Sequence, residues 1–151
     1  GNGSVAKNVA QTKGSIGYVE YAYAKQNKLT HTDMINKDGK RVKPTSASFA
    51  AAAANADWNS APGYGVILAN QPGAESWPMT AATWILMYKA PTDPEAAKLA
   101  LQFFAWAYDN GAKAADELDY IAMPANVVKS VKAMWAKDIK DSAGKPVFAS
   151  N

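Results

Sequence analysis

The segment from Pro91 to Gly111 places the strongest constraint on how this 151-residue chain folds. Asp93 or Thr92 can cap a helix there, a proline stands in the first turn, and Glu95 lies near the positive end of the helix dipole. Apolar residues then recur at helical spacing: Ala97, Leu101, Phe104 and Tyr108, widened by Ala100, Phe103 and Ala107. The pattern predicts an amphipathic helix of about seventeen residues, held in place by the packing of its apolar face.

A second helix is predicted after Pro124, and it ends near Ile139, ahead of a turn at residues 141–146. Its predicted buried face consists of Val127, Val131, Met134 and Trp135. Burial of each large side chain contributes about 1.5–3 kcal/mol to folding. The last third of the chain is therefore expected to be helical and to be held together by packing.

Composition excludes several classes of protein. Hydrophobic residues make up 48% of the chain and charged residues 19%, far from the composition of disordered chains. The absence of cysteine excludes a disulfide framework, a thiolate metal site and a cysteine nucleophile, and the single His31 excludes a site with two imidazoles. No apolar run approaches the roughly 18 residues of a membrane-spanning helix.

The first half of the chain is predicted to mix short helices and strands. A helix is expected to open at the glycine-rich start, with Ser4 or Asn2 as its N-cap, and to stop at Gly14. Residues 15–21 favour a strand because they are rich in β-branched and aromatic side chains, and residues 21–27 favour a turn or two of helix. Two further elements are predicted, a hairpin pairing 34–35 with 42 around the Asp38-Gly39 turn and a helix over about 46–56.

The middle of the chain provides a connection and one more strand. Residues 57–78 are rich in Gly, Pro, Asn and Ser, and only Gly65 to Leu68 resembles a buried strand or a turn of helix. Residues 83–88 form a short, continuous apolar run, which is typical of a strand covered on both faces in a sheet flanked by helices. The predicted fold class is therefore α/β.

Neither of the two common hydrolytic arrangements is supported by the sequence. Asp116, Glu117 and Asp119 lie in a polar stretch where solvation would keep them ionised, so they do not form an acid and base pair with separated pKa values. His31 is the only available base, it lies in a polar run typical of the surface, and no Gly-x-Ser-x-Gly elbow is present. We expect no catalytic residues and no enzymatic activity.

Aromatic and basic clusters offer two further interpretations. Trp84, Trp106 and Trp135 lie in apolar periodic segments and are predicted to be core, which leaves Trp58 and Trp77 in loops as weak candidates for stacking on sugar rings. The only basic cluster, at Lys37, Lys40, Arg41 and Lys43, surrounds the Asp38-Gly39 turn. It favours a solvated turn over a nucleic-acid surface, which usually has more arginine and a longer basic stripe. No nucleic-acid partner is expected.

The Gly1-Asn2-Gly3-Ser4 opening admits two interpretations. Free N–H groups at a helix start form an anion site when glycine lets a ligand approach, so Asn2, Gly3 and Ser4 are candidate anion ligands. A simple helix cap explains the same residues equally well, and no lysine follows in the P-loop register.

Five strings in register resemble one family across nearly the whole chain: Gly14 to Ala24, Ala74 to Thr80, Phe103 to Lys113, Leu118 to Pro124 and Ile139 to Pro146. They are similar to the periplasmic phosphate-binding protein of the bacterial high-affinity phosphate ABC transporter. The resemblance implies a two-lobed α/β (type II) solute-binding protein that closes on inorganic phosphate and delivers it to membrane permease subunits, without a cofactor or metal. A complete family member is about twice this long, and the chain resembles its C-terminal half.

The resemblance transfers no ligand residue to this chain. In the family, phosphate is held by main-chain N–H groups, Ser and Thr hydroxyls, one aspartate and one arginine, on segments that precede Gly1. The arginine-containing Ser-Gly-Thr segment has no match here, and Arg41 lies in an unrelated turn. The phosphate site therefore stays unassigned, with Asn2, Gly3 and Ser4 as its candidates in this chain.

The resemblance also divides the chain. Residues 1–76 correspond to the trailing part of one lobe, and residues 77–151 to the crossover strand and C-terminal helices of the other. The net charge of +3 follows this division, with eight Lys/Arg against five Asp/Glu in the first part and eight against eight in the second. Neither part completes a sheet, so we expect a periplasmic fragment that needs its missing half or self-association. A scaffold without independent ligand binding is the alternative.

Overall fold

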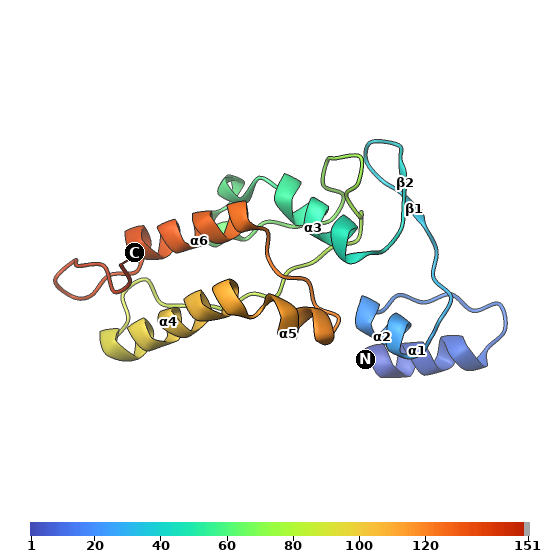
Figure 1. Cartoon of the computed structure of the whole chain (residues 1–151), viewed down its shortest axis with the longest axis horizontal. Coiled ribbons are helices and arrows are strands. Elements are labelled where there is room, and N and C mark those ends of the chain that lie inside the picture. Colours follow the sequence, from blue (N-terminus) through green and yellow to red (C-terminus); the bar gives the residue numbers. More distant parts are fainter. Residues whose placement is uncertain (150–151) are drawn as a thin grey trace.

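A computed structural model describes residues 1–149 as a helix-rich, elongated molecule with one small sheet. Figure 1 shows two long helices side by side along the body of the molecule and a pair of short helices beyond one end. The combination of helices with a small antiparallel sheet is compatible with the predicted α/β class. The two-lobed arrangement stays a prediction, and residues 150–151 of its second part lie outside the described residues.

The two long helices are α4, Pro94–Asn110, and α6, Ala125–Asp138. The predicted cap of α4 is confirmed, because the Asp93 side chain accepts a hydrogen bond of 3.0 Å from the N–H of Ala96. A short helix that the sequence did not predict, α5 (Ala112–Glu117), lies between them. It includes Asp116 and Glu117 of the polar stretch identified in the sequence.

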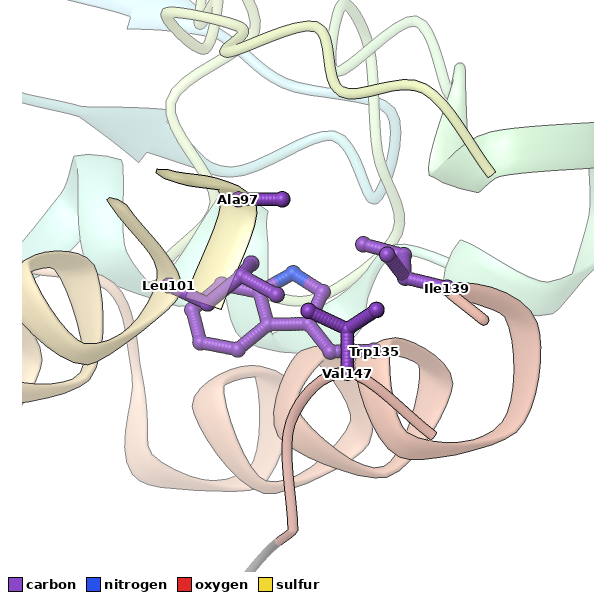
Figure 2. Close-up of a cluster of buried hydrophobic side chains, with 5 residues drawn as sticks. All are labelled: Ala97, Leu101, Trp135, Ile139 and Val147. Atoms are coloured by element: carbon purple, nitrogen blue, oxygen red, sulfur yellow. The ribbon is translucent and has the colours of Figure 1, made fainter. Parts of the chain in front are cut away.

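The first core cluster joins α4 to α6 and to the chain after α6, and Figure 2 shows its side chains converging on one indole ring. Its buried members are Ala97, Leu101, Trp135, Ile139 and Val147. Leu101 is fully buried, and the ring of Phe148 meets that of Trp135 edge-on at 5.4 Å. Trp135 is therefore core, as predicted, whereas Val131 and Met134 are only partly buried.

The second core cluster lies between α6 and helix α3, Ser46–Asn55. Thr45 and Ser48 form a capping box at the start of α3, in which each side chain accepts the backbone N–H of the other residue. The helix predicted over about 46–56 is therefore confirmed. Two short 3₁₀ turns follow, η1 (Trp58–Ser60) and η2 (Pro62–Tyr64). The buried members of the cluster are Ala53, Trp58, Leu68 and Val127.

The predicted hairpin is confirmed. Strands β1 (Met34–Ile35) and β2 (Arg41–Val42) pair antiparallel, with Met34 opposite Val42. Gly39 has a φ of +73°, a left-handed conformation that glycine adopts at little cost. The hairpin is short, and a side chain in its turn attaches it to the rest of the molecule.

That side chain is Asn36, which is buried. Its amide nitrogen donates hydrogen bonds to the carbonyl oxygens of Gly73, Ala74 and Ser76 at 3.0, 2.9 and 3.3 Å. Its amide oxygen accepts from the N–H groups of Asp38 and Lys40 at 3.1 and 2.9 Å. One side chain therefore holds both the turn of the hairpin and the loop before Trp77, and within residues 1–149 no buried side-chain polar atom lacks a partner.

At the beginning of the chain, helix α1 (Asn2–Gln11) packs against helix α2 (Tyr21–Gln26). The helical segment at 21–27 is thus confirmed, but the strand predicted for residues 15–21 is wrong. Residues 15–20 have no regular structure, and the side chains of Ile16 and Tyr18 are 98% and 82% exposed.

The strand predicted at residues 83–88 is also wrong in this structure. Among the described residues, no backbone–backbone hydrogen bond joins residues 81–88 to another residue, and Leu86 is 91% exposed. The short segment at 65–68 is likewise irregular, although Leu68 is buried. β-branched and aromatic residues favour a sheet only where a neighbouring strand accepts their backbone hydrogen bonds. The described chain provides no such neighbour.

The distribution of tryptophans also differs from the prediction. Trp84 and Trp106, predicted to be core, are 43% and 59% exposed. Trp58 and Trp77, predicted to lie in loops, are buried. Trp58 donates its indole N–H to the carbonyl of Ala53 at 2.7 Å, which satisfies its polar atom inside the second cluster.

Replacement of Leu101 by alanine tests the first core cluster. Leu101 is fully buried between α4 and α6, so Leu101→Ala is expected to lower the free energy of unfolding by about 2–5 kcal/mol. Leu99 is on the same helix but 65% exposed, so Leu99→Ala serves as the control and should change this free energy by much less. Urea unfolding followed by circular dichroism measures both. Equal losses for the two variants would contradict the assignment of the core.

Replacement of Asn36 by alanine tests the clamp on the hairpin. The variant removes the Asn36 partner from three carbonyl groups and two N–H groups, of which the Gly73 carbonyl keeps the N–H of Ser76, so we expect a loss of about 1–3 kcal/mol. Asn27→Ala is the matched control, because the Asn27 amide makes one exposed hydrogen bond, to the carbonyl of Tyr23. A thermal unfolding midpoint that falls equally in both variants would show that Asn36 has no special role.

Candidate functional site

The start of α1 carries the anion ligands that the sequence predicts as candidates, Asn2, Gly3 and Ser4. The N-cap is Gly1, whose carbonyl accepts the N–H groups of Ser4 and Val5 at 3.1 and 3.2 Å. No side chain caps the helix, so the predicted cap by Ser4 or Asn2 is wrong. The Asn2 side chain instead accepts the N–H of Glu20 at 3.3 Å, which ties the irregular segment 15–20 to α1.

The N–H groups of Asn2 and Gly3 have no acceptor inside α1, as in any helix of this kind. Together with the positive end of the helix dipole, such groups can accept an anion. Gly3 leaves its side open, since a Cβ placed there would have the ring of Tyr23 at 4.0 Å as its nearest neighbour. The chemistry of this helix start is therefore that of an anion acceptor, and its use as a phosphate ligand stays a prediction.

The acidic residues of the α5 region are not brought together as a catalytic pair. Glu117 lies 3.9 Å from Lys113 on the surface, and Asp116 is exposed. Asp119 differs from the prediction, because its side chain is only 11% exposed and forms an ion pair with Lys25. That carboxylate raises the pKa of the Lys25 ammonium, mainly by accepting its hydrogen bond. The sequence gives no indication that Lys25 and Asp119 lie close together, because the two residues are 94 positions apart.

His31 is exposed, as predicted, and lies 6.3 Å from the ring of Tyr21, edge to face. The basic cluster at Lys37, Lys40, Arg41 and Lys43 is exposed around the hairpin turn, which fits a solvated turn. Among the hydrogen bonds described for residues 1–149, none joins His31 or the basic cluster to the start of α1. Within the same residues, no three His, Asp or Glu side chains gather as metal ligands would.

Two hollows lie beside α6. One, of about 350 Å³, is lined by Trp58, Tyr64, Met134 and Asp138 among others. The second, of about 390 Å³, contains Lys129 and Lys132 and the phenol of Tyr108, whose pKa is raised by burial. Lys132 already pairs with both carboxylate oxygens of Asp109, at 2.8 and 2.9 Å. Its charge is therefore compensated, and the hollow does not present a free basic pair to an anion.

Comparison with known proteins identifies the relatives of the chain, although no family model matches it. The chain is 50% identical over 148 residues to the phosphate-binding protein PstS of Pasteurella multocida. This alignment covers 98% of this chain and 43% of that protein. It is 50% identical over 140 residues to PstS of Haemophilus influenzae, and 48% identical over 140 residues to PstS of Xylella fastidiosa. These alignments cover 93% of this chain and 42% and 38% of the two proteins.

These relatives place the chain among the solute-binding proteins, as its resemblance implied. Over the region that it spans, the chain belongs to the PstS family of phosphate-binding proteins. It spans about two fifths of the length of the relatives that it matches. Among residues 1–149, no helix combines the length and the apolar character that crossing a membrane requires.

Substitution of Gly17 tests how the irregular segment is seated on α1. A Cβ at Gly17 would lie 2.8 Å from Val5 Cγ1 and 2.9 Å from Val9 Cγ2, closer than packed carbon atoms approach. We expect Gly17→Ala to lower the free energy of unfolding by about 1–3 kcal/mol. The control is Gly3→Ala, which has room for the methyl group and replaces glycine within a helix, so it should be neutral or stabilising. Unaltered urea unfolding of Gly17→Ala would contradict this packing.

Proposed function

We propose that the chain is the C-terminal portion of a periplasmic substrate-binding protein that captures inorganic phosphate for import by an ABC transporter. The observation that carries the proposal is the 50% identity to a phosphate-binding protein over 98% of this chain. The five quoted strings support the same assignment. In this function the protein binds phosphate without changing it, and its partners are the membrane permease subunits that accept the phosphate.

The chain contributes structural parts of both lobes to such a protein. Residues 1–76 form the trailing part of one lobe and residues 77–151 the returning part of the other. The second core cluster supports a hinge near this boundary, because Val127 of α6 packs with Trp58 and Leu68 of the first part. Lobes that share a packed cluster on one side can open and close on the other side.

The resemblance implies that the principal phosphate ligands lie outside the part of the family that this chain spans. Within residues 1–149 the only anion-accepting group proposed for this role is the start of α1, at Asn2, Gly3 and Ser4. Its chemistry is suited to phosphate, but a single helix start binds an anion weakly. The isolated chain is therefore expected to bind phosphate weakly or not at all.

The exposed apolar segments support a longer protein. Residues 83–88 carry large side chains and no charge, and Ile85, Leu86 and Tyr88 are 58%, 91% and 83% exposed. An exposed, uncharged segment of this composition is unfavourable in water and is normally covered. The relatives are longer than this chain, and in the complete protein the additional residues would cover these side chains.

The second candidate function is a scaffold that self-associates without binding a ligand of its own. The same observation favours it, because a six-residue apolar segment without charge or proline tends to pair with a copy of itself. Sizing chromatography distinguishes the candidates at several chain concentrations. Concentration-dependent association of the isolated chain that is lost in the complete protein supports the phosphate-binding function, whereas association that persists in the complete protein supports the scaffold.

Isothermal calorimetry with inorganic phosphate tests the proposed function. The complete protein that contains this chain is expected to bind phosphate tightly, because the ligands of both lobes are present. The isolated chain is expected to give no measurable heat at the same concentrations. Sulfate titrated into the complete protein is the control for a general anion effect.

Either of two results would contradict this proposal. Failure of the complete protein to bind phosphate would remove the function. Micromolar binding by the isolated chain would show that the ligands lie within these residues, and it would make Asn2, Gly3 and Ser4 the first residues to replace.

A further inference from the structure

The ion pair between Lys25 and Asp119 joins two regions that otherwise have little contact. Lys25 belongs to α2, and Asp119 follows α5. Among the hydrogen bonds described for residues 1–149, this is the only one that connects residues 1–33 with residues 77–149. In Figure 1, the pair of helices α1 and α2 lies beyond the end of α5. Helix α3 packs on α6, in a different part of the molecule.

The backbone at Asp119 shows that the carboxylate is not required by the local fold. The N–H of Tyr120 donates to the carbonyl of Ala115 at 2.9 Å, and the N–H of Asp119 donates to that of Asp116 at 3.0 Å. These two bonds form a Schellman motif at the end of α5, with Asp119 at its left-handed position, φ +62°. Glycine is the usual residue at this position, because a Cβ there carries a steric cost that glycine avoids.

Asp119 is thus a residue with a strained backbone whose side chain is 11% exposed and directed at a cation from a different part of the chain. Lys25 is more exposed, at 57%, and it extends from the last turn of α2. An aspartate in place of glycine costs backbone stability at α5, and what it provides in this structure is the contact with α2.

We propose that Lys25 and Asp119 are a positioning pair between the two lobes, which favours their closed arrangement around phosphate. This inference rests on the proposed function and goes beyond it, because neither residue is placed as a phosphate ligand. Lys25 lies in the first part of the chain and Asp119 in the second, on opposite sides of the boundary at residues 76 and 77.

The position of the pair relative to the second core cluster gives the direction of the effect. The cluster of Trp58, Leu68 and Val127 joins the two parts under α3 and α6, where a hinge is proposed. The ion pair joins them at α2 and the end of α5, on residues outside this cluster, and Tyr21 of α2 also meets Phe49 of α3 edge-on at 5.4 Å. A contact across two lobes and away from their hinge forms when the lobes approach and is lost when they separate. The pair therefore stabilises the closed form and slows the release of phosphate.

The test uses the complete protein that contains this chain and measures its dissociation constant for inorganic phosphate. Asp119→Gly removes the carboxylate and gives the left-handed position its preferred residue, so α5 keeps its end. Lys25→Met removes the charge and keeps most of the aliphatic side chain. Each variant is expected to bind phosphate about two- to fivefold more weakly, mainly through faster release, and the double variant no more weakly than either.

Two controls separate positioning from a structural defect. Lys25→Arg keeps the charge and is expected to retain the affinity, whereas a merely structural role of the lysine would not distinguish arginine from methionine in this way. Lys28→Met removes a charge two residues after α2, from a lysine that forms no ion pair with a described residue, and it should leave phosphate binding unchanged. Affinities of Asp119→Gly and Lys25→Met equal to that of the unmodified protein would overturn the proposal.

A distance measurement tests the pair independently of phosphate. The chain has no cysteine, so spin labels can be attached at Lys7→Cys on α1 and Gln102→Cys on α4, both exposed positions. Asp119→Gly is expected to broaden and lengthen the distance distribution between the labels, and an unchanged distribution would overturn the inference. If the unmodified protein failed to bind phosphate, the proposed function alone would be contradicted, and the label distances would still decide whether the pair positions the two parts.

Discussion

The packing of α4 against α6 around Trp135 is the interaction on which the rest of the described structure depends. Leu101 is fully buried there, and Ile139 and Val147 close the cluster from the segment after α6. This packing holds the first half of α4 against the end of α6. The connection between the two helices, which contains α5 and Asp119, runs from the C-cap of α4 at Gly111 to the N-cap of α6 at Pro124.

Polar contacts have a different role from the apolar core in this molecule. Asn36 holds the hairpin to the loop before Trp77 with five hydrogen bonds, and each of its partners is a backbone group. Such contacts fix the position of irregular segments, whose backbone groups have no partner in a helix or sheet. The ion pair of Lys25 with Asp119 acts over a longer range, because it connects elements that share little apolar surface.

Sequence patterns predicted the elements whose contacts are local and failed where a distant partner decides. The capped helix beginning after Asp93, the helix beginning after Thr45 and the Asp38-Gly39 hairpin were predictable, because caps and turns act within a few residues. The strands at 15–21 and 83–88 were not, since strand formation requires a neighbouring strand that the described chain does not provide. Trp58 and Trp84 were misassigned for a related reason: the two indole rings are neighbours at 5.9 Å, and only the three-dimensional packing decides that Trp58 is covered by the second cluster and Trp84 is not.

The amino-acid sequence by itself determined the helical last third, the absence of thiol chemistry and the family to which the chain belongs, because periodicity, composition and matching strings are properties of the order of residues. Only the tertiary structure decided that Asn2 binds the backbone of Glu20 instead of capping α1. It also decided that Asp119 is a partner of Lys25 instead of a solvated acid. In both cases the partner is remote in the chain, and a side chain chooses between water and a protein group only after the fold brings that group within hydrogen-bond distance.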